Sequence, residues 1–190
     1  MLENFLVRKN VKTGAKLSVK AAVSLFVTAL AAALPQLVHL VAGASGGMTW
    51  LPMYAPVLLG GCVLGFKWGL AVGALSPLVS FGITSALGDP MPAAARLPFM
   101  MAELAVFAAV AGAFSKAIDK SAWAAFPAVL LAAVTGRAVF IALVAVFESV
   151  SSLTVAAVWQ QVQQGFIGLI LQAVAVPAVV MALRAAMHRE

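Results

Sequence analysis

Three ionisable side chains interrupt long apolar stretches of this sequence: Arg96, Glu103 and Arg137. A charge within hydrocarbon is costly, so each of them is a functional candidate by default. Arg96 and Glu103 are seven residues apart, which places them on one face of a helix with Glu103 about 10 Å further along the axis. Arg137 lies at a similar depth in the next apolar run. The spacing therefore allows Glu103 and Arg137 to pair.

Several interpretations of these charges stay open. In one interpretation, Glu103 and Arg137 only join two helices and neither contacts a ligand. Alternatively, Arg96 or Arg137 binds an anionic or carbonyl group of a molecule that enters from outside. A third interpretation is that Arg96 only extends its charged end toward water.

Uncharged polar residues add a second group of candidates. Gln160, Gln164, Gly168 and Gln172 recur at four-residue spacing, which makes one face of a continuous helix polar. Glutamine both donates and accepts hydrogen bonds, so Gln164 and Gln172 suit recognition of an uncharged ligand edge. Hydrogen bonding between helices is the alternative role.

Aromatic and imidazole side chains flank the expected outer surface. Trp50 and Tyr54 either anchor the chain at the headgroup level or belong to a loop that closes an outward cavity. His39 is a further binding candidate, but it has no Cys, His or acidic partner at a metal-ligand spacing. We therefore expect no metal site and no cofactor.

Composition decides the class of protein. Of the 190 residues 64% are hydrophobic and only 9% are charged, whereas a soluble domain carries about 25% charged residues. The net charge of +6 suits membrane orientation better than nucleic-acid binding. Cys62 is the only cysteine, and no catalytic or phosphate-binding motif is present in the sequence. We expect an all-α integral membrane protein of the cell membrane that is not an enzyme.

The apolar runs predict six transmembrane helices. A basic amino-terminal segment, 1–20, precedes a single membrane domain, 21–187. Gly43 to Gly47 is expected to form a flexible loop after the first span. The predicted spans cover 21–42, 54–64, 69–87, 95–115, 123–147 and 156–183.

The basic residues predict one orientation. Ten of the twelve fall on one side of these spans, which places both termini in the cytoplasm and requires an even number of spans. The ten are Arg8, Lys9, Lys12, Lys16, Lys20, Lys67, Lys116, Lys120, Arg184 and Arg189.

Motifs in the middle of the chain resemble one family of membrane proteins. They comprise 52–61 (PMYAPVLLGG), 64–69 (LGFKWG), Gly73, 75–77 (LSP) and 96–104 (RLPFMMAEL). With the span order, they resemble the substrate-binding S components of energy-coupling factor vitamin transporters. Specific motifs cover 52–112, and Tyr54 stands where the family often has histidine.

The resemblance implies a six-helix, S-component-like bundle that binds one vitamin or vitamin precursor on its outer face. It also implies a transmembrane coupling subunit and two cytoplasmic ATPase subunits as partners. The family's docking surface includes an Ala-x-x-x-Ala pattern on the first helix. Ala29 and Ala33 match it at greater depth than expected, and Ala22 is the shallower candidate.

Two functions of other classes stay open beside this one. The chain is alternatively a proton- or sodium-coupled secondary transporter that uses Glu103 to carry the ion. Its six expected spans show no obvious internal repeat of the kind such transporters use. As a structural scaffold, it would bind no ligand, and its buried polar groups would pair only with one another.

Overall fold

The computed structural model of this chain describes residues 1–189, and all its regular secondary structure over that range is helical. The side chains of Ala44, Ser45 and Arg189 lie outside the described part, as does the predicted contribution of Arg189 to the basic side. The all-α expectation is confirmed for the described residues.

Six longer helices and four short ones make up the described part of the chain. The longer helices are α2 (Thr13–Trp50), α3 (Tyr54–Leu64), α4 (Phe66–Ala86), α5 (Leu97–Ala113), α7 (Ala125–Phe147) and α9 (Phe166–Arg189). The short ones are α1 (Leu2–Arg8), α6 (Ser115–Lys120), the 3₁₀ helix η1 (Ala122–Ala124) and α8 (Val155–Gln164).

Five helical segments are long and apolar enough to cross a membrane: Thr13–Gly43, Gly46–Leu64, Phe66–Ala86, Ala122–Phe147 and Phe166–His188. The segment predicted as a span over 95–115 contains α5, an apolar helix of 17 residues. These lengths and compositions support a multi-pass membrane protein. The count of six spans stays a prediction.

The structure differs from the prediction at both ends of the first span, 21–42. The first long helix begins at Thr13, so the segment 1–20 holds α1 and the first turns of α2. The expected loop at Gly43 to Gly47 is instead a local break: only Gly43 (φ 64°, ψ −169°) is non-helical inside α2. Glycine adopts a positive φ at little cost, so the chain can leave the helical conformation at Gly43 alone.

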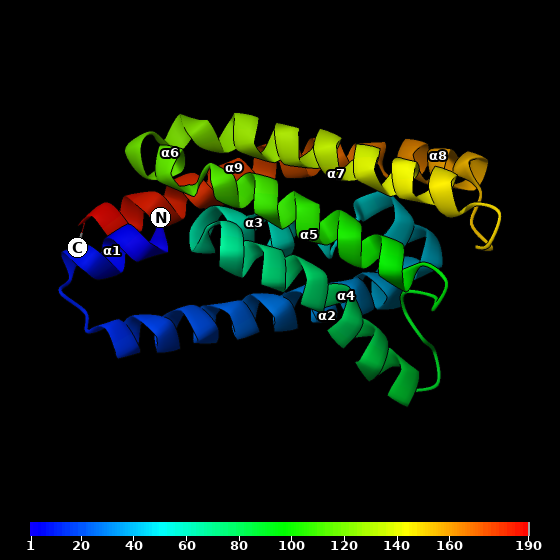
Figure 1. Cartoon of the computed structure of the whole chain (residues 1–190), viewed down its shortest axis with the longest axis horizontal. Helices are drawn as coiled ribbons and strands as arrows, with labels where there is room; N and C mark the ends of the chain where they lie inside the picture. Colours follow the sequence, from blue (N-terminus) through cyan, green and yellow to red (C-terminus); the bar gives the residue numbers. More distant parts are fainter. Residues whose placement is uncertain (190) are drawn as a thin grey trace.

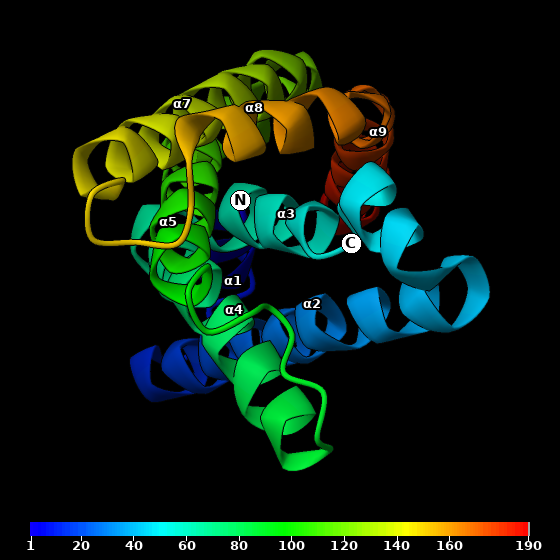
Figure 2. The ribbon, with the colours of Figure 1, turned by 90° about the vertical axis from the view of Figure 1, so that its right-hand side faces the viewer.

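The predicted span 156–183 is wrong as a single helix. It divides at Gly165 into α8 and α9, and α8 lies across the end of the bundle between α7 and α9 (Figure 2). Thr154 caps the start of α8, because its hydroxyl oxygen accepts a hydrogen bond from the Ala157 amide at 3.2 Å. The polar run of glutamines therefore belongs to a short crossing helix.

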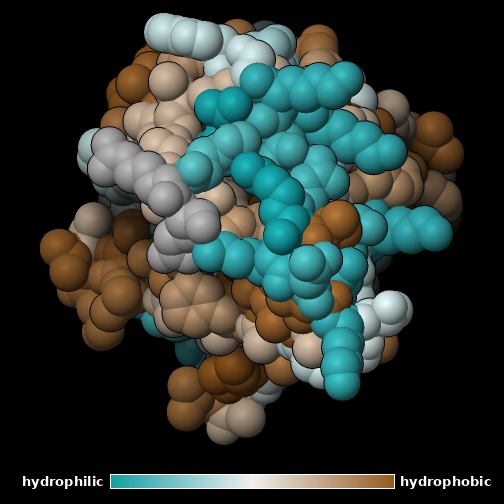
Figure 3. Space-filling model, turned by 90° about the vertical axis from the view of Figure 1, so that its left-hand side faces the viewer, coloured by the Kyte–Doolittle hydropathy of each residue, from teal (hydrophilic) through white to brown (hydrophobic). Residues whose placement is uncertain are grey.

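The bundle has two distinct ends (Figure 1). The chain termini and α6 lie at one end, which we call the terminal end. The α4–α5 and α7–α8 connections lie at the other, the loop end. Hydrophilic surface gathers on the terminal end beside apolar surface (Figure 3).

Glycines bring the inner helices into close contact. A Cβ at Gly61 would overlap the backbone of Ala108, and one at Gly73 would overlap that of Leu104. Helices α3 and α4 therefore pack directly on the backbone of α5, and Phe107 of α5 is fully buried. This packing fixes Tyr54, at the start of α3, against the middle of α5.

Candidate ligand pocket

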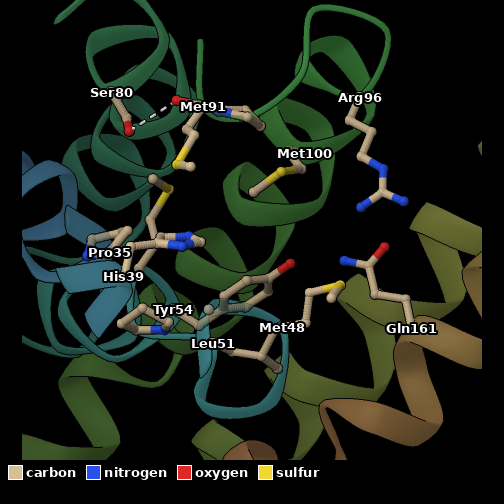
Figure 4. Close-up of a pocket in the computed structure, with 14 residues that line it drawn as sticks. Pro35, His39, Met48, Leu51, Tyr54, Ser80, Met91, Arg96, Met100 and Gln161 are labelled. Carbon is tan, nitrogen blue, oxygen red and sulfur yellow. Dashed lines mark hydrogen bonds between the residues drawn. The ribbon is translucent and has the colours of Figure 1, made fainter. Parts of the chain in front are cut away.

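A pocket of about 260 Å³ opens at the loop end (Figure 4). Its wall comes from α2, the α2–α3 connection, the start of α3, α4, the α4–α5 connection, the start of α5, and α8. The lining residues are Pro35, His39, Gly47, Met48, Leu51, Pro52, Met53, Tyr54, Ser80, Met91, Pro92, Arg96, Met100 and Gln161. Three of the candidates from the sequence are among them: His39, Tyr54 and Arg96.

Two polar side chains face each other across this pocket. Arg96, just before α5, and Gln161, on α8, point their polar ends toward one another (Figure 4). The Gln161 Oε1 atom is buried and has no hydrogen-bond partner among the described residues. A guanidinium and a carboxamide in this arrangement can both donate to one carboxylate.

The rest of the wall is mostly apolar and polarisable. Met48, Met53, Met91 and Met100 contribute thioether side chains, which adapt to irregular shapes and contact aromatic rings favourably. His39 adds an imidazole that lies against Gly47, where a Cβ would come within 2.6 Å of His39 Nε2. The absence of a side chain at Gly47 therefore leaves room for the ring.

Tyr54 forms part of the pocket wall and also contacts a buried ion pair. Its hydroxyl donates a hydrogen bond of 2.7 Å to Glu103 Oε2. The other carboxylate oxygen, Oε1, is 2.9 Å from Arg137 Nη1. The Arg137 guanidinium carbon also lies 4.9 Å from the centre of the Tyr54 ring, within cation–π range.

Glu103 and Arg137 thus meet as their spacing predicts, and they join α5 to α7. Glu103 is fully buried and Arg137 is 5% exposed. The short distance makes an ion pair, but no guanidinium N–H points at an acceptor within the described residues, so the pair lacks an aligned hydrogen bond. Both side chains lie outside the pocket wall, next to Tyr54.

The remaining candidates lie elsewhere. Gln172 is buried and donates to the carbonyl oxygens of Trp50 (3.2 Å) and Leu51 (2.9 Å), so it holds the α2–α3 connection to α9. Gln164 is exposed and does not line the pocket. The Trp50 side chain is also exposed and outside the wall.

The face of glutamines expected from the four-residue spacing does not form. That spacing places residues on one face only within one continuous helix, and Gly165 ends α8 between Gln164 and Gln172. Gln161 is the glutamine that reaches the pocket. Sequence reasoning missed it, together with Met91 and Met100, although Gln161 belongs to the same glutamine run.

The three alanines proposed for subunit docking are exposed on α2. Ala29 and Ala33 border an apolar groove of about 380 Å³ between α2 and α4, and Ala22 lies nearer the terminal end. Their small side chains leave the α2 backbone open to close approach by another helix.

Searches with protein-family models, among curated proteins and among solved structures found no match to this chain. The functional interpretation therefore rests on the sequence motifs and on the geometry of the pocket.

Proposed function

We propose that this chain is the membrane-embedded substrate-binding subunit of an energy-coupling factor importer. In this role it captures a small water-soluble vitamin or vitamin precursor in the loop-end pocket. The observation that carries the proposal is the opposed pair Arg96 and Gln161 above a wall of methionines and Tyr54. Segments of the motifs that resemble this family, 52–61 and 96–104, contribute part of that wall.

The pocket's size and chemistry indicate the class of ligand. Its volume of about 260 Å³ lies just below the usual range for small-molecule sites, about 300 to 1,000 Å³, which indicates a compact ligand. Arg96 supplies a charged donor for a carboxylate or polarised carbonyl, and Gln161 supplies a second donor and an acceptor. The methionines suit an apolar or conjugated body. A compact carboxylate of the pantothenate class meets these requirements.

Transport through such a subunit draws its energy from partners. The sequence has no Gly-rich loop with a Lys and a Ser or Thr that would bind nucleotide phosphates. We therefore assign ATP hydrolysis to two cytoplasmic ATPase subunits. The coupling subunit would dock on the exposed alanine face of Ala22, Ala29 and Ala33. The loop end is the outer, ligand-capturing end in the predicted orientation.

The geometry favours this function over an ion-coupled secondary transporter. A carrier carboxylate must exchange its ion with water, and Glu103 is fully buried. One of its oxygens contacts Tyr54 and the other lies beside Arg137. The positive charge of Arg137 at this distance also opposes the binding of a sodium ion at Glu103.

Mass spectrometry of the purified chain is the first test. We expect protein from cells grown in rich medium, once denatured, to release one small carboxylate in stoichiometric amount. Arg96→Gln and Gln161→Leu should each lower the affinity for that molecule by about tenfold or more, because each removes a hydrogen bond to it. Gln164→Leu, on the same helix but outside the pocket, is the matched control and should bind as the unaltered chain does.

Two results would overturn the proposal. One is an empty protein whose thermal unfolding shifts with no vitamin of a broad panel. The other is accumulation of substrate in liposomes by the chain alone under an ion gradient, which would indicate a secondary transporter.

A further inference from the structure

A second hollow, of about 770 Å³, lies at the terminal end of the bundle, far from the ligand pocket. It is bordered by α1, by the α3–α4 junction at Gly65, and by the junction of α5 with α6. Three lysines line it: Lys20, Lys67 and Lys116. They come from α2, α4 and α6, so the fold gathers them from separate parts of the chain.

The charges in this hollow are not balanced. Lys20 is paired with Glu3, its Nζ lying 3.1 Å from Oε2. Lys67 and Lys116 are exposed, and their side chains make no ion pair or hydrogen bond within the described residues. Among the side chains, three lysines against one glutamate leave two positive charges, and the amino-terminal residue Met1 also borders the hollow. The hollow therefore suits an anion.

One side of the hollow is apolar and aromatic. Leu64, Phe66 and Trp68 border it, and Phe66 is 54% exposed. They lie where α3 ends and α4 begins, and α4 is one of the helices long and apolar enough to cross a membrane. Lysines beside tryptophan at the end of such a helix are the composition of a membrane–water interface.

We propose that this hollow binds the phosphate headgroup of an anionic phospholipid. Lys67 and Lys116 contact the phosphate, while Phe66 and Trp68 pack against the start of the acyl chains. Basic pockets between membrane helices bind acidic headgroups in this way. A free phosphate ion would satisfy the lysines but leave the aromatic side of the hollow uncovered, so the lipid is the better fit.

Native mass spectrometry of the full chain in detergent tests this site. Phosphatidylglycerol and phosphatidylcholine with identical acyl chains are added in equal amounts. We expect about tenfold stronger retention of phosphatidylglycerol, and Lys67→Gln/Lys116→Gln should abolish most of that preference. Lys67→Arg/Lys116→Arg should keep it, because it conserves both charges.

A matched control separates the hollow from general attraction to a basic surface. Lys12→Gln/Lys16→Gln also removes two positive charges, near the terminal end but outside the hollow. This variant should retain the preference for phosphatidylglycerol. Equal retention of both lipids by the unaltered chain would overturn the proposal. An equal loss of the lipid preference in the control variant would also overturn it, because it would indicate attraction to diffuse charge. Displacement of phosphatidylglycerol by inorganic phosphate would overturn it too, because it would indicate a site for the free ion.

Discussion

Both ends of the bundle gather polar side chains, but they use them differently. At the terminal end, Asp119 of α6 accepts a hydrogen bond of 2.8 Å from Asn4 and lies 3.7 Å from Arg8 and 3.6 Å from His188. Arg184 donates to the Asp119 carbonyl oxygen at 3.1 Å. At the loop end, Arg96 and Gln161 make no side-chain hydrogen bond within the described residues.

At the terminal end the polar side chains bind one another, whereas at the loop end, among the described residues, two of them are free to bind a ligand. Asp119 ties α1 and α9 to α6, so its polar partners hold together segments that are distant in sequence. One Asp119 oxygen accepts from Asn4 and the other lies within ion-pair distance of Arg8 and His188. The Gln161 Oε1 atom has neither a hydrogen bond nor an ion pair within the described residues, so it gains more by accepting from a ligand. The contrast supports the loop end as the place of capture.

The largest effect on stability is expected at Glu103, which is fully buried. Glu103→Ala leaves Arg137 buried without its counter-charge and should reduce the free energy of unfolding by about 3 to 5 kcal/mol. Thermal unfolding of the purified protein in detergent measures it. The double variant Glu103→Leu/Arg137→Met removes both charges and should be more stable than Glu103→Ala. A double variant as unstable as the single one would show that the charge pair is not the cause.

A smaller effect is expected from Tyr54→Phe. It removes the hydrogen bond to buried Glu103 but keeps the ring in the pocket wall, and it should cost about 1 to 3 kcal/mol. Ligand affinity should change far less than with Arg96→Gln. Unchanged thermal unfolding would contradict the role of the hydroxyl in supporting Glu103.

At the terminal end, Asp119→Asn should cost about 1 kcal/mol, because the ion-pair partners Arg8 and His188 are partly exposed and such pairs contribute little. Burial raises the pKa of the Asp119 carboxyl, but the hydrogen bond from Asn4 and nearby positive charges outweigh it, so this pKa lies below its ordinary value. The carboxylate therefore stabilises the fold above its unfolded pKa of about 4. As the pH falls through the lower folded value, that stabilisation is lost.

Unfolding scans at neutral and acidic pH measure this contribution. The unaltered chain should lose more stability on acidification than Asp119→Asn, which has no carboxyl to protonate. An equal loss in both proteins would assign the acid sensitivity to other groups.

The smallest effect is expected from Gln164→Ala, a substitution on the exposed face of α8. It should change the free energy of unfolding by no more than about 0.5 kcal/mol, as is usual for surface positions. Gln161→Ala, three residues earlier on the same helix, should weaken ligand binding. If the two variants behave alike, Gln161 does not distinguish the pocket face of α8.

Much of the fold was predictable because it depends on composition and length. The apolar runs correspond to helices, and the spacing of Glu103 and Arg137 predicted their contact. The break at Gly165 was harder to predict, since a single glycine inside an apolar helix is tolerated at modest cost. Only the crossing direction of α8 brings Gln161, rather than Gln164, to the pocket.

The pocket wall was least predictable because it is assembled from distant segments. Met91 and Met100 have no pattern that marks them as ligand contacts, and methionine in an apolar run is usually packing. They become neighbours of His39 only when the α4–α5 connection lies over the end of α2. Such proximity depends on tertiary structure rather than on local periodicity.

The separation of α8 from α9 has a kinetic consequence. Helix α8 starts at a capped residue and ends at Gly165, so it is a short rigid rod with a turn at each end, and it carries one of the two opposed polar groups. Outward displacement of this rod would widen the entrance without disturbing the long helices. Under the proposed function, a molecule held between Arg96 and Gln161 would leave when α8 moves away, so its residence time would depend on α8 more than on the stability of the long helices.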